Sequence, residues 1–381
     1  MTTTDPLDLW VMEDFAAHPG LLQAALDGAY RAMGLSAPKL NIRVLSWSRA
    51  WSDLARAPDQ GARPHVIQVG TSWLNPLVHL GLLRPFPAEA EPGTAWPVAS
   101  LAAPLNEDRW IDGYAWGLPW MVDVRLLYAR ADHPPCAKIE DFAACLGPEC
   151  QWLVPAQSEP GLVQMLAMWI WSWGGELIPQ EGTFAKSWDG AVRALHAMGR
   201  AGGIDGSGLT MGSAEAHDRF FLQGRGDMVV TRPWAQGHQR AVAVLPFPSS
   251  GFGRNVFLGG SYLSVTTREP VHPEGFRVAG LLTSPTAQRM LSRATGYWPA
   301  TEGVALPVLD PAVPVGVAEN VADAVRTLPS VPHWRYLERL LARAGSDLLR
   351  TTVRREPWGR AQEILERIEQ DVDEVRAVTA L

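Results

Sequence analysis

Positive charge is scarce in this chain of 381 residues. It has 33 Lys and Arg against 40 Asp and Glu, a formal net charge of −7. Proteins that bind nucleic acid need a basic surface for the phosphates, so this balance argues against a nucleic-acid partner. Lysine is nearly absent, with only Lys39, Lys138 and Lys186, and arginine supplies most of the positive charge. We attribute this bias to genome composition, not to function.

Cysteine is also scarce. Cys136, Cys145 and Cys150 are the three in the chain. An odd number in one short stretch is no disulfide framework, and no histidines stand nearby at zinc-site spacing. The sequence therefore predicts no metal site and no cofactor. Cys145 and Cys150 would pair in an oxidising compartment, and the alternative is a set of buried thiols.

The chain lacks a visible targeting segment and a membrane-spanning run. Its first 15 residues are acidic, without a basic region followed by an apolar one. The apolar run over 162–171 is too short, because a bilayer needs about 20 residues. We expect a soluble protein, either cytoplasmic or supplied without its export signal.

Tryptophan is abundant, with 17 Trp against 6 Tyr and 10 Phe. Cores are filled more easily by aliphatic side chains and Phe, whereas Trp offers a large flat face and one N–H donor. We expect most of these indoles to be structural and a few to line a ligand surface. The hydrophobic share of 47% supports a sizeable core, and the length predicts two domains or lobes.

Strand and helix patterns alternate at the start of the chain. Short alternating or apolar runs predict strands at 7–11, 40–45 and 66–69, and helical patterns follow at 19–33, 47–57 and 73–83. This order predicts a parallel α/β sheet. Further helices are expected at 139–146, 161–173, 187–198 with Ser187 as N-cap, 214–223, 270–284, 285–295, 333–344 and 359–377.

Six segments, in order along the chain, carry a family resemblance. The first is 66–73 together with 80–85, and the next two are 113–128 and 173–177. The last three are 221–228 with the nearby Trp234, 259–263 and 297–300. Together they resemble the extracellular solute-binding proteins of ABC importers, in the carbohydrate-binding group related to maltose-binding protein. The resemblance covers nearly the whole chain. One position departs from it, since the family usually carries Asp where this chain has His65.

The resemblance implies a two-lobed α/β fold of the type II periplasmic-binding-protein class, with the ligand in a cleft between the lobes. The expected lobes are 1–120 plus about 261–308, and 121–260 plus about 309–381, with Gly259 and Gly260 at a crossing or hinge. It also implies a monomeric receptor that binds a small sugar outside the cytoplasm and delivers it to the membrane subunits of an importer.

Candidate ligand-binding residues follow from strand ends. Open parallel sheets bind ligands beyond the carboxyl ends of their strands. Aromatic plates suit the apolar face of a sugar, and planar polar groups suit its hydroxyls. Strand ends give Trp10, Ser72, Trp73, Trp120 and Trp234, and Glu13 follows Trp10 within reach. Asp123 and Arg125 share one face, and Trp171 and Trp173 lie near one helix end. The resemblance adds Gly260, Ser261 and Trp298.

Other functions stay open at this point. Asp123 and Arg125 share a face and could simply pair with each other. A glycoside hydrolase needs two carboxylates at a set separation, and no complete catalytic constellation stands in the sequence. A ligand sensor that does not serve transport would share the same fold. A polyamine ligand would need several carboxylates, for which Glu13, Asp14 and Asp123 are the candidates.

Overall fold

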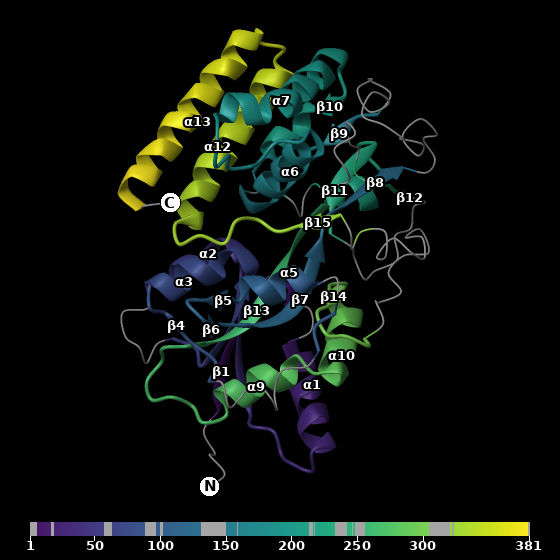
Figure 1. The fold of residues 1–381 in the computed structure, drawn as a ribbon. Helices are drawn as coiled ribbons and strands as arrows, with labels where there is room; N and C mark the ends of the chain where they lie inside the picture. Colours follow the sequence, from purple (N-terminus) through teal and green to yellow (C-terminus); the bar gives the residue numbers. More distant parts are fainter. Residues whose placement is uncertain are drawn as a thin grey trace.

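The computed structural model shows two lobes (Figure 1). It describes residues 6–16, 19–56, 63–87, 97–99, 102–130, 150–157, 159–212, 216, 218–232, 242–245, 247, 256–304, 321 and 324–379. The predicted α/β class is confirmed. The predicted helix at 139–146, Trp234, Cys136 and Cys145 lie outside the described residues.

The first lobe is built on an eight-stranded sheet with the main order β14-β7-β13-β3-β1-β2, while β4 and β15 pair with β13. The neighbours β2, β1 and β3 run parallel, and β13 runs antiparallel to both β3 and β7. The strands are β1 (Leu7–Met12), β2 (Leu40–Leu45), β3 (Val66–Gly70), β4 (Leu83–Arg84), β7 (Leu118–Val124), β13 (Val256–Thr266), β14 (Trp298–Pro299) and β15 (Val325–Arg326).

The sheet of the first lobe is buried on both faces. In β1, Leu7, Leu9 and Val11 belong to one apolar cluster, whereas Trp10 and Met12 belong to another. This follows from the alternation of side chains along a strand, and it explains why the strand is apolar almost throughout. Helices α1 (Pro19–Ala32), α9 (Gly275–Leu282) and α10 (Pro285–Thr295) pack together on one face. The other lobe-one helices are α2 (Trp47–Ala55), α3 (Leu74–His79) and α5 (Ala103–Asp108).

The second lobe has a five-stranded sheet in the order β10-β9-β11-β8-β12. Its strands are β8 (Leu126–Arg130), β9 (Trp152–Leu153), β10 (Ile204–Asp205), β11 (Met228–Thr231) and β12 (Val242–Leu245). Strands β9, β10 and β11 run parallel, and β8 runs antiparallel to β11 and β12. A separate hairpin, β5 (Trp110–Ile111) and β6 (Tyr114–Ala115), belongs to neither large sheet.

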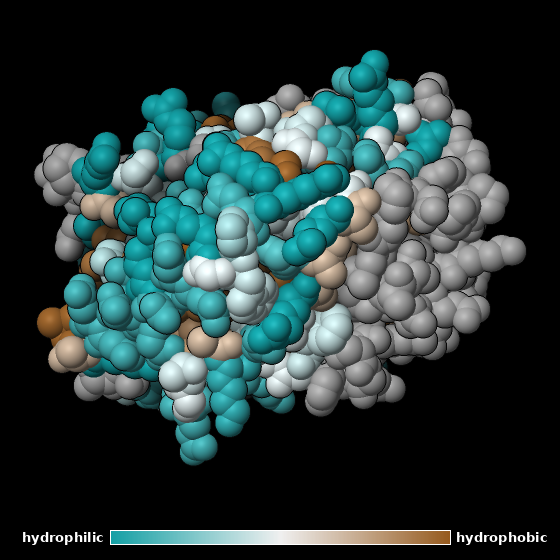
Figure 2. Space-filling view, turned by 90° about the horizontal axis from the view of Figure 1, so that it is seen from above, coloured by the Kyte–Doolittle hydropathy of each residue, from teal (hydrophilic) through white to brown (hydrophobic). Residues whose placement is uncertain are grey.

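Four long helices cover the second lobe: α6 (Glu159–Ser172), α7 (Phe184–Ala201), α12 (Trp334–Val353) and α13 (Trp358–Thr379). They pack against one another. The face of the molecule seen from this end is largely hydrophilic, with apolar side chains in small separate areas (Figure 2). This agrees with α7, α12 and α13, which bury one apolar stripe and leave the opposite face in water, whereas α6 is buried along most of its length. None of the described helices is both long and apolar enough to cross a bilayer.

Helix ends follow ordinary capping chemistry, and two segments differ from the sequence prediction. Helix α7 begins earlier than predicted, because Thr183 is its N-cap and accepts from the Lys186 amide. Ser187 instead bonds the backbone of Glu176. Gly174 ends α6 with φ 75°, as its residue type predicted. Within the predicted helix at 214–223, the described residues show Ala216 as helical and Asp218–Leu222 as a short π-helix.

In the described part of the chain, three segments mark passages between the lobes. Strand β7 ends at Val124 in the first sheet and β8 starts at Leu126 in the second, so Arg125 stands at the change. The other two are the start of β13 and the segment from β15 to α12 (Figure 1). The lobe boundaries expected at 120/121 and 260/261 fall inside β7 and β13. Gly260 has φ 139°, and a Cβ there would lie 1.9 Å from the Met121 carbonyl oxygen, so only glycine fits.

Candidate ligand-binding cleft

The carboxyl ends of three parallel strands line one side of the region between the lobes. Strands β1, β2 and β3 end at Met12, Leu45 and Gly70. The residues that follow them are the 3₁₀ turn Glu13–Phe15, Ser46 with Trp47, and the 3₁₀ turn Thr71–Trp73. This edge is where open parallel sheets bind ligands.

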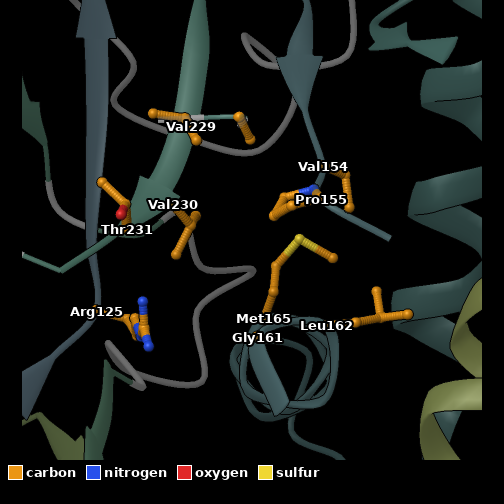
Figure 3. Close-up of a pocket in the computed structure, with 10 residues that line it drawn as sticks. Arg125, Val154, Pro155, Gly161, Leu162, Met165, Val229, Val230 and Thr231 are labelled. Atoms are coloured by element: carbon orange, nitrogen blue, oxygen red, sulfur yellow. The ribbon is translucent and has the colours of Figure 1, made fainter. Parts of the chain in front are cut away.

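The second sheet presents its own edge. Strands β9 and β11 end there and β8 begins there, which brings together Arg125, Thr231 and the segment after Leu153. Figure 3 shows a pocket at this edge, with Arg125 and Thr231 on one side and Met165 and Leu162 of α6 on the other. Its cavity volume, measured as the space that the centre of a water molecule can reach, is about 20 Å³. Such a cavity holds about one water molecule. The pocket is therefore too small for a sugar ring in this conformation.

An ion pair joins the two edges. Arg232, directly after β11 of the second lobe, donates to Oδ1 of Asp14, directly after β1 of the first lobe, at 2.6 Å. The guanidinium also donates to the hydroxyl of Tyr297 and lies 4.6 Å from the centre of that ring. The Asp14 and Arg232 side chains are only 4% and 18% exposed. The lobes thus touch through a nearly buried charge pair.

Charge at this junction is balanced. Asp123 at the end of β7 accepts from Arg125 at 2.8 Å, and both side chains are largely buried. Burial alone would lower the pKa of the Arg232 guanidinium, but Tyr297, Asp14 and Asp123 together raise it above its ordinary value. Burial raises the pKa of the Tyr297 phenol well above its usual range. Two carboxylates and two guanidinium groups are thus paired at this junction.

Beside the ion pair stands a group of three tryptophans. Trp47 donates its indole N–H to Oδ2 of Asp14 at 2.8 Å, and its ring meets Trp73 edge to face at 5.4 Å. Trp51 meets Trp73 in the same way at 5.7 Å. Arg335 of α12 lies 5.6 Å from the Trp51 ring and 5.5 Å from the Trp73 ring. Trp47 and Trp51 stay partly exposed, whereas Trp73 is buried beneath them.

Five of the predicted contact residues belong to the buried apolar clusters: Trp73, Trp171, Trp10, Trp120 and Trp298. Trp120 is 0% exposed, stacks on Phe15 at 5.0 Å and donates to the Leu282 carbonyl. Trp298 in β14 is also fully buried. Trp10 is buried with Arg43 over its ring. In this conformation Trp120, Trp298 and Trp10 have no free face for a ligand, so here the structure differs from the expectation.

The remaining predicted residues divide between the cleft and its surroundings. Glu13, Ser72, Asp123 and Arg125 lie at the facing edges, with Glu13 exposed and Ser72 half-buried. The others lie in packed structure or outside the described part of the chain: Trp171 is buried under Arg326, Trp173 packs against Gly190 of α7, Gly260 and Ser261 lie within β13, and Trp234 is not described.

The sequence prediction did not include Trp47, Arg232 or Tyr297, and it named Asp14 only as a candidate carboxylate for a polyamine ligand. A signal existed for Trp47, because it follows the strand predicted at 40–45 as closely as Trp73 follows the strand predicted at 66–69.

Comparisons with known proteins agree with this arrangement. A Brucella abortus binding protein is 25% identical over 213 residues, which are 51% of this chain and 50% of the relative. The chain thus spans about half the length of the curated relatives it matches.

Solved structures share the fold over almost the full length. The GacH receptor of Streptomyces glaucescens, solved unliganded and with acarbose, matches with a TM-score of 0.72 and 15% identity over 96% of this chain and 100% of that one. The maltose-bound MalE3 of T. maritima matches with a TM-score of 0.73 and 18% sequence identity, over 97% of this chain and 100% of that one.

The two-lobed solute-binding fold expected from the sequence is therefore confirmed. The model of the bacterial extracellular solute-binding proteins matches residues 34–320, about three quarters of the chain. The chain belongs to the family of bacterial extracellular solute-binding proteins.

Proposed function

We propose that this protein binds a small neutral carbohydrate in the cleft between its lobes and releases it unchanged. The observation that carries the proposal is the meeting of two strand-end edges, which places Trp47 beside Asp14 of one lobe and Arg232 of the other. The fold neighbours include proteins solved with acarbose, maltose and cycloalternan.

The chemistry of these residues suits a sugar. A pyranose has an apolar face of C–H groups, which the partly exposed ring of Trp47 can cover. Its hydroxyls both donate and accept hydrogen bonds, and planar carboxylate and guanidinium groups offer both partners. Because Asp14, Asp123, Arg125 and Arg232 balance one another, the junction favours a ligand without net charge over a polyamine or an acid.

A hydrolytic function has little support at this junction. A glycosidase needs one carboxyl held protonated by apolar surroundings and a second one nearby that is ionised. Asp14 and Asp123 each lie against an arginine instead. Binding without catalysis is the function that these contacts favour.

Calorimetric titration with a panel of neutral mono- and oligosaccharides tests the proposal, with amino acids and polyamines as comparison ligands. We expect a neutral sugar to bind with 1:1 stoichiometry and each comparison ligand to fail. A screen in which only an amino acid or polyamine binds would remove the sugar assignment. Incubation of the sugar with the protein, followed by chromatography, should return it intact.

We further propose that the protein serves as a monomeric receptor for the membrane subunits of an ABC importer. The disulfide at Cys150 supports this, because structural disulfides persist in oxidising compartments outside the cytoplasm. A sensor inside the cell is the alternative. Fractionation of cells that express the natural gene separates the two: an extracytoplasmic protein supports the receptor, and a cytosolic one supports the sensor.

A further inference from the structure

We propose that Arg232 is a latch that holds the two lobes together before any ligand arrives. Arg232 follows β11 of the second sheet, yet the partners of its guanidinium belong to the first lobe. They are Asp14 after β1 and Tyr297 just before β14. The proposal depends on the two-lobed fold and on these contacts, and not on the ligand being a sugar.

The latch is strong because its contacts are of three kinds and are mostly hidden from water. The charge pair with Asp14 is 2.6 Å long, the Tyr297 hydroxyl accepts a further hydrogen bond, and the guanidinium lies 4.6 Å from the Tyr297 ring centre. Charged hydrogen bonds and cation–π contacts both gain strength when desolvated. Separation of the lobes must break all three contacts at once.

The receiving side of the latch is preformed. Trp47 holds Oδ2 of Asp14, which leaves Oδ1 facing Arg232. When Arg232 withdraws, the carboxylate keeps its Trp47 bond and the same position, ready to accept either the guanidinium or a ligand donor. Ligand and latch therefore compete for one oxygen atom, and the latch lowers the fraction of protein open to ligand.

Small-angle X-ray scattering of the ligand-free protein tests the latch directly. The wild-type protein should give the radius of gyration calculated from this structure, in which Arg232 joins the lobes. Arg232→Gln, which removes the charge, should give a larger radius, and Tyr297→Phe, which removes only the hydroxyl, an intermediate one. Arg232→Lys keeps the charge and should restore part of the compaction.

The matched control is Arg193→Gln. Arg193 also pairs with an aspartate, Asp189 at 2.8 Å, and also lies over an indole, Trp358 at 4.6 Å, but all three residues belong to the second lobe. Its substitution should leave the radius unchanged. Circular dichroism and a urea titration show that each variant is folded before it is measured.

The latch proposal is contradicted if Arg232→Gln and Tyr297→Phe both give the same radius of gyration as the wild type. It is also contradicted if the wild type already has a radius as large as that of Arg232→Gln. Both outcomes are read without ligand, so they are independent of the sugar screen. Where the screen yields a binding sugar, its association rate should rise about tenfold in Arg232→Gln. An unchanged association rate would also contradict the latch.

Discussion

One carboxylate, that of Asp14, is held by the residues that follow two different strands in two different sheets. Trp47, after β2, donates to Oδ2 at 2.8 Å, and Arg232, after β11, donates to Oδ1 at 2.6 Å. The indole and the guanidinium fix the plane of the carboxylate between them. When Arg232 withdraws, the Trp47 bond still holds Oδ2, so a ligand would meet an acceptor that is already oriented, which lowers the entropic cost of binding.

Removal of the Trp47 ring should weaken sugar binding and leave the fold intact. Trp47→Ala deletes a partly exposed face and one donor to Asp14, so we expect about a tenfold loss of affinity, equivalent to about 1.4 kcal/mol. Calorimetry with the sugar found in the screen measures it. Trp110→Ala is the control, since Trp110 is 44% exposed on the separate hairpin, and it should bind as the wild type does.

Trp120 should behave in the opposite way. Its ring is buried against Phe15 and its N–H is bonded to the Leu282 carbonyl, so Trp120→Ala opens a large cavity. We expect a loss of about 3–5 kcal/mol in the free energy of unfolding, measured by urea denaturation, with unchanged affinity per folded molecule. A stable variant with weakened binding would return Trp120 to the ligand surface.

Acid should destabilise the protein partly through His65. Burial, helped by the charges of Arg268 and His272, lowers the pKa of His65 from 6.5 to about 4, and its Nδ1 accepts from the Asp8 amide. The unfolded chain takes up the proton near pH 6.5, whereas the folded one resists until about pH 4. The stability that depends on neutral His65 is thus present above pH 6.5 and is lost as the pH falls towards 4, by about 3 kcal/mol at most.

The variant His65→Asn isolates that contribution. Its amide oxygen can still accept from the Asp8 amide, and it does not titrate. Urea titrations of both proteins between pH 8 and pH 4 should show a steeper decline for the wild type. Parallel curves would mean that His65 is protonated as easily in the folded protein as in the unfolded one.

Thiol counting checks the disulfide at Cys150. The chain has three cysteines, so one intramolecular bond leaves one free thiol in the denatured, non-reduced protein. Reduction should destabilise the fold by about 2–4 kcal/mol. Three reactive thiols before reduction would contradict the bond, and mass spectrometry of a non-reduced digest identifies the partner cysteine.

Three strands of the first lobe could be predicted because each carries its own signal. The runs at 7–11, 40–45 and 66–69 are alternating or apolar, and all three became parallel neighbours in one sheet. The lobes around them were expected from six short segments. Residue patterns and resemblance were sufficient for this level of the fold.

The contacts of the cleft could not be predicted in the same way. Trp73 and Trp120 both stand in or next to a strand, but only the packing of Trp47 and Trp51 over Trp73, and of Phe15 on Trp120, makes them buried. The link between Asp14 and Arg232 spans 218 residues. Such pairs depend on how the two lobes pack against each other, and no local sequence pattern indicates that packing.

Strand β13 has a consequence for the order in which the chain becomes structured during synthesis. It lies between β3 and β7 and is hydrogen-bonded to both, yet it comes from residues 256–266. A ribosome must therefore translate most of the second lobe before the first sheet can close. Until then β3 and β7 each present an unpaired edge, and unpaired strand edges are the places where nascent chains associate wrongly. The growing chain therefore needs protection at these two edges until residue 266 has emerged.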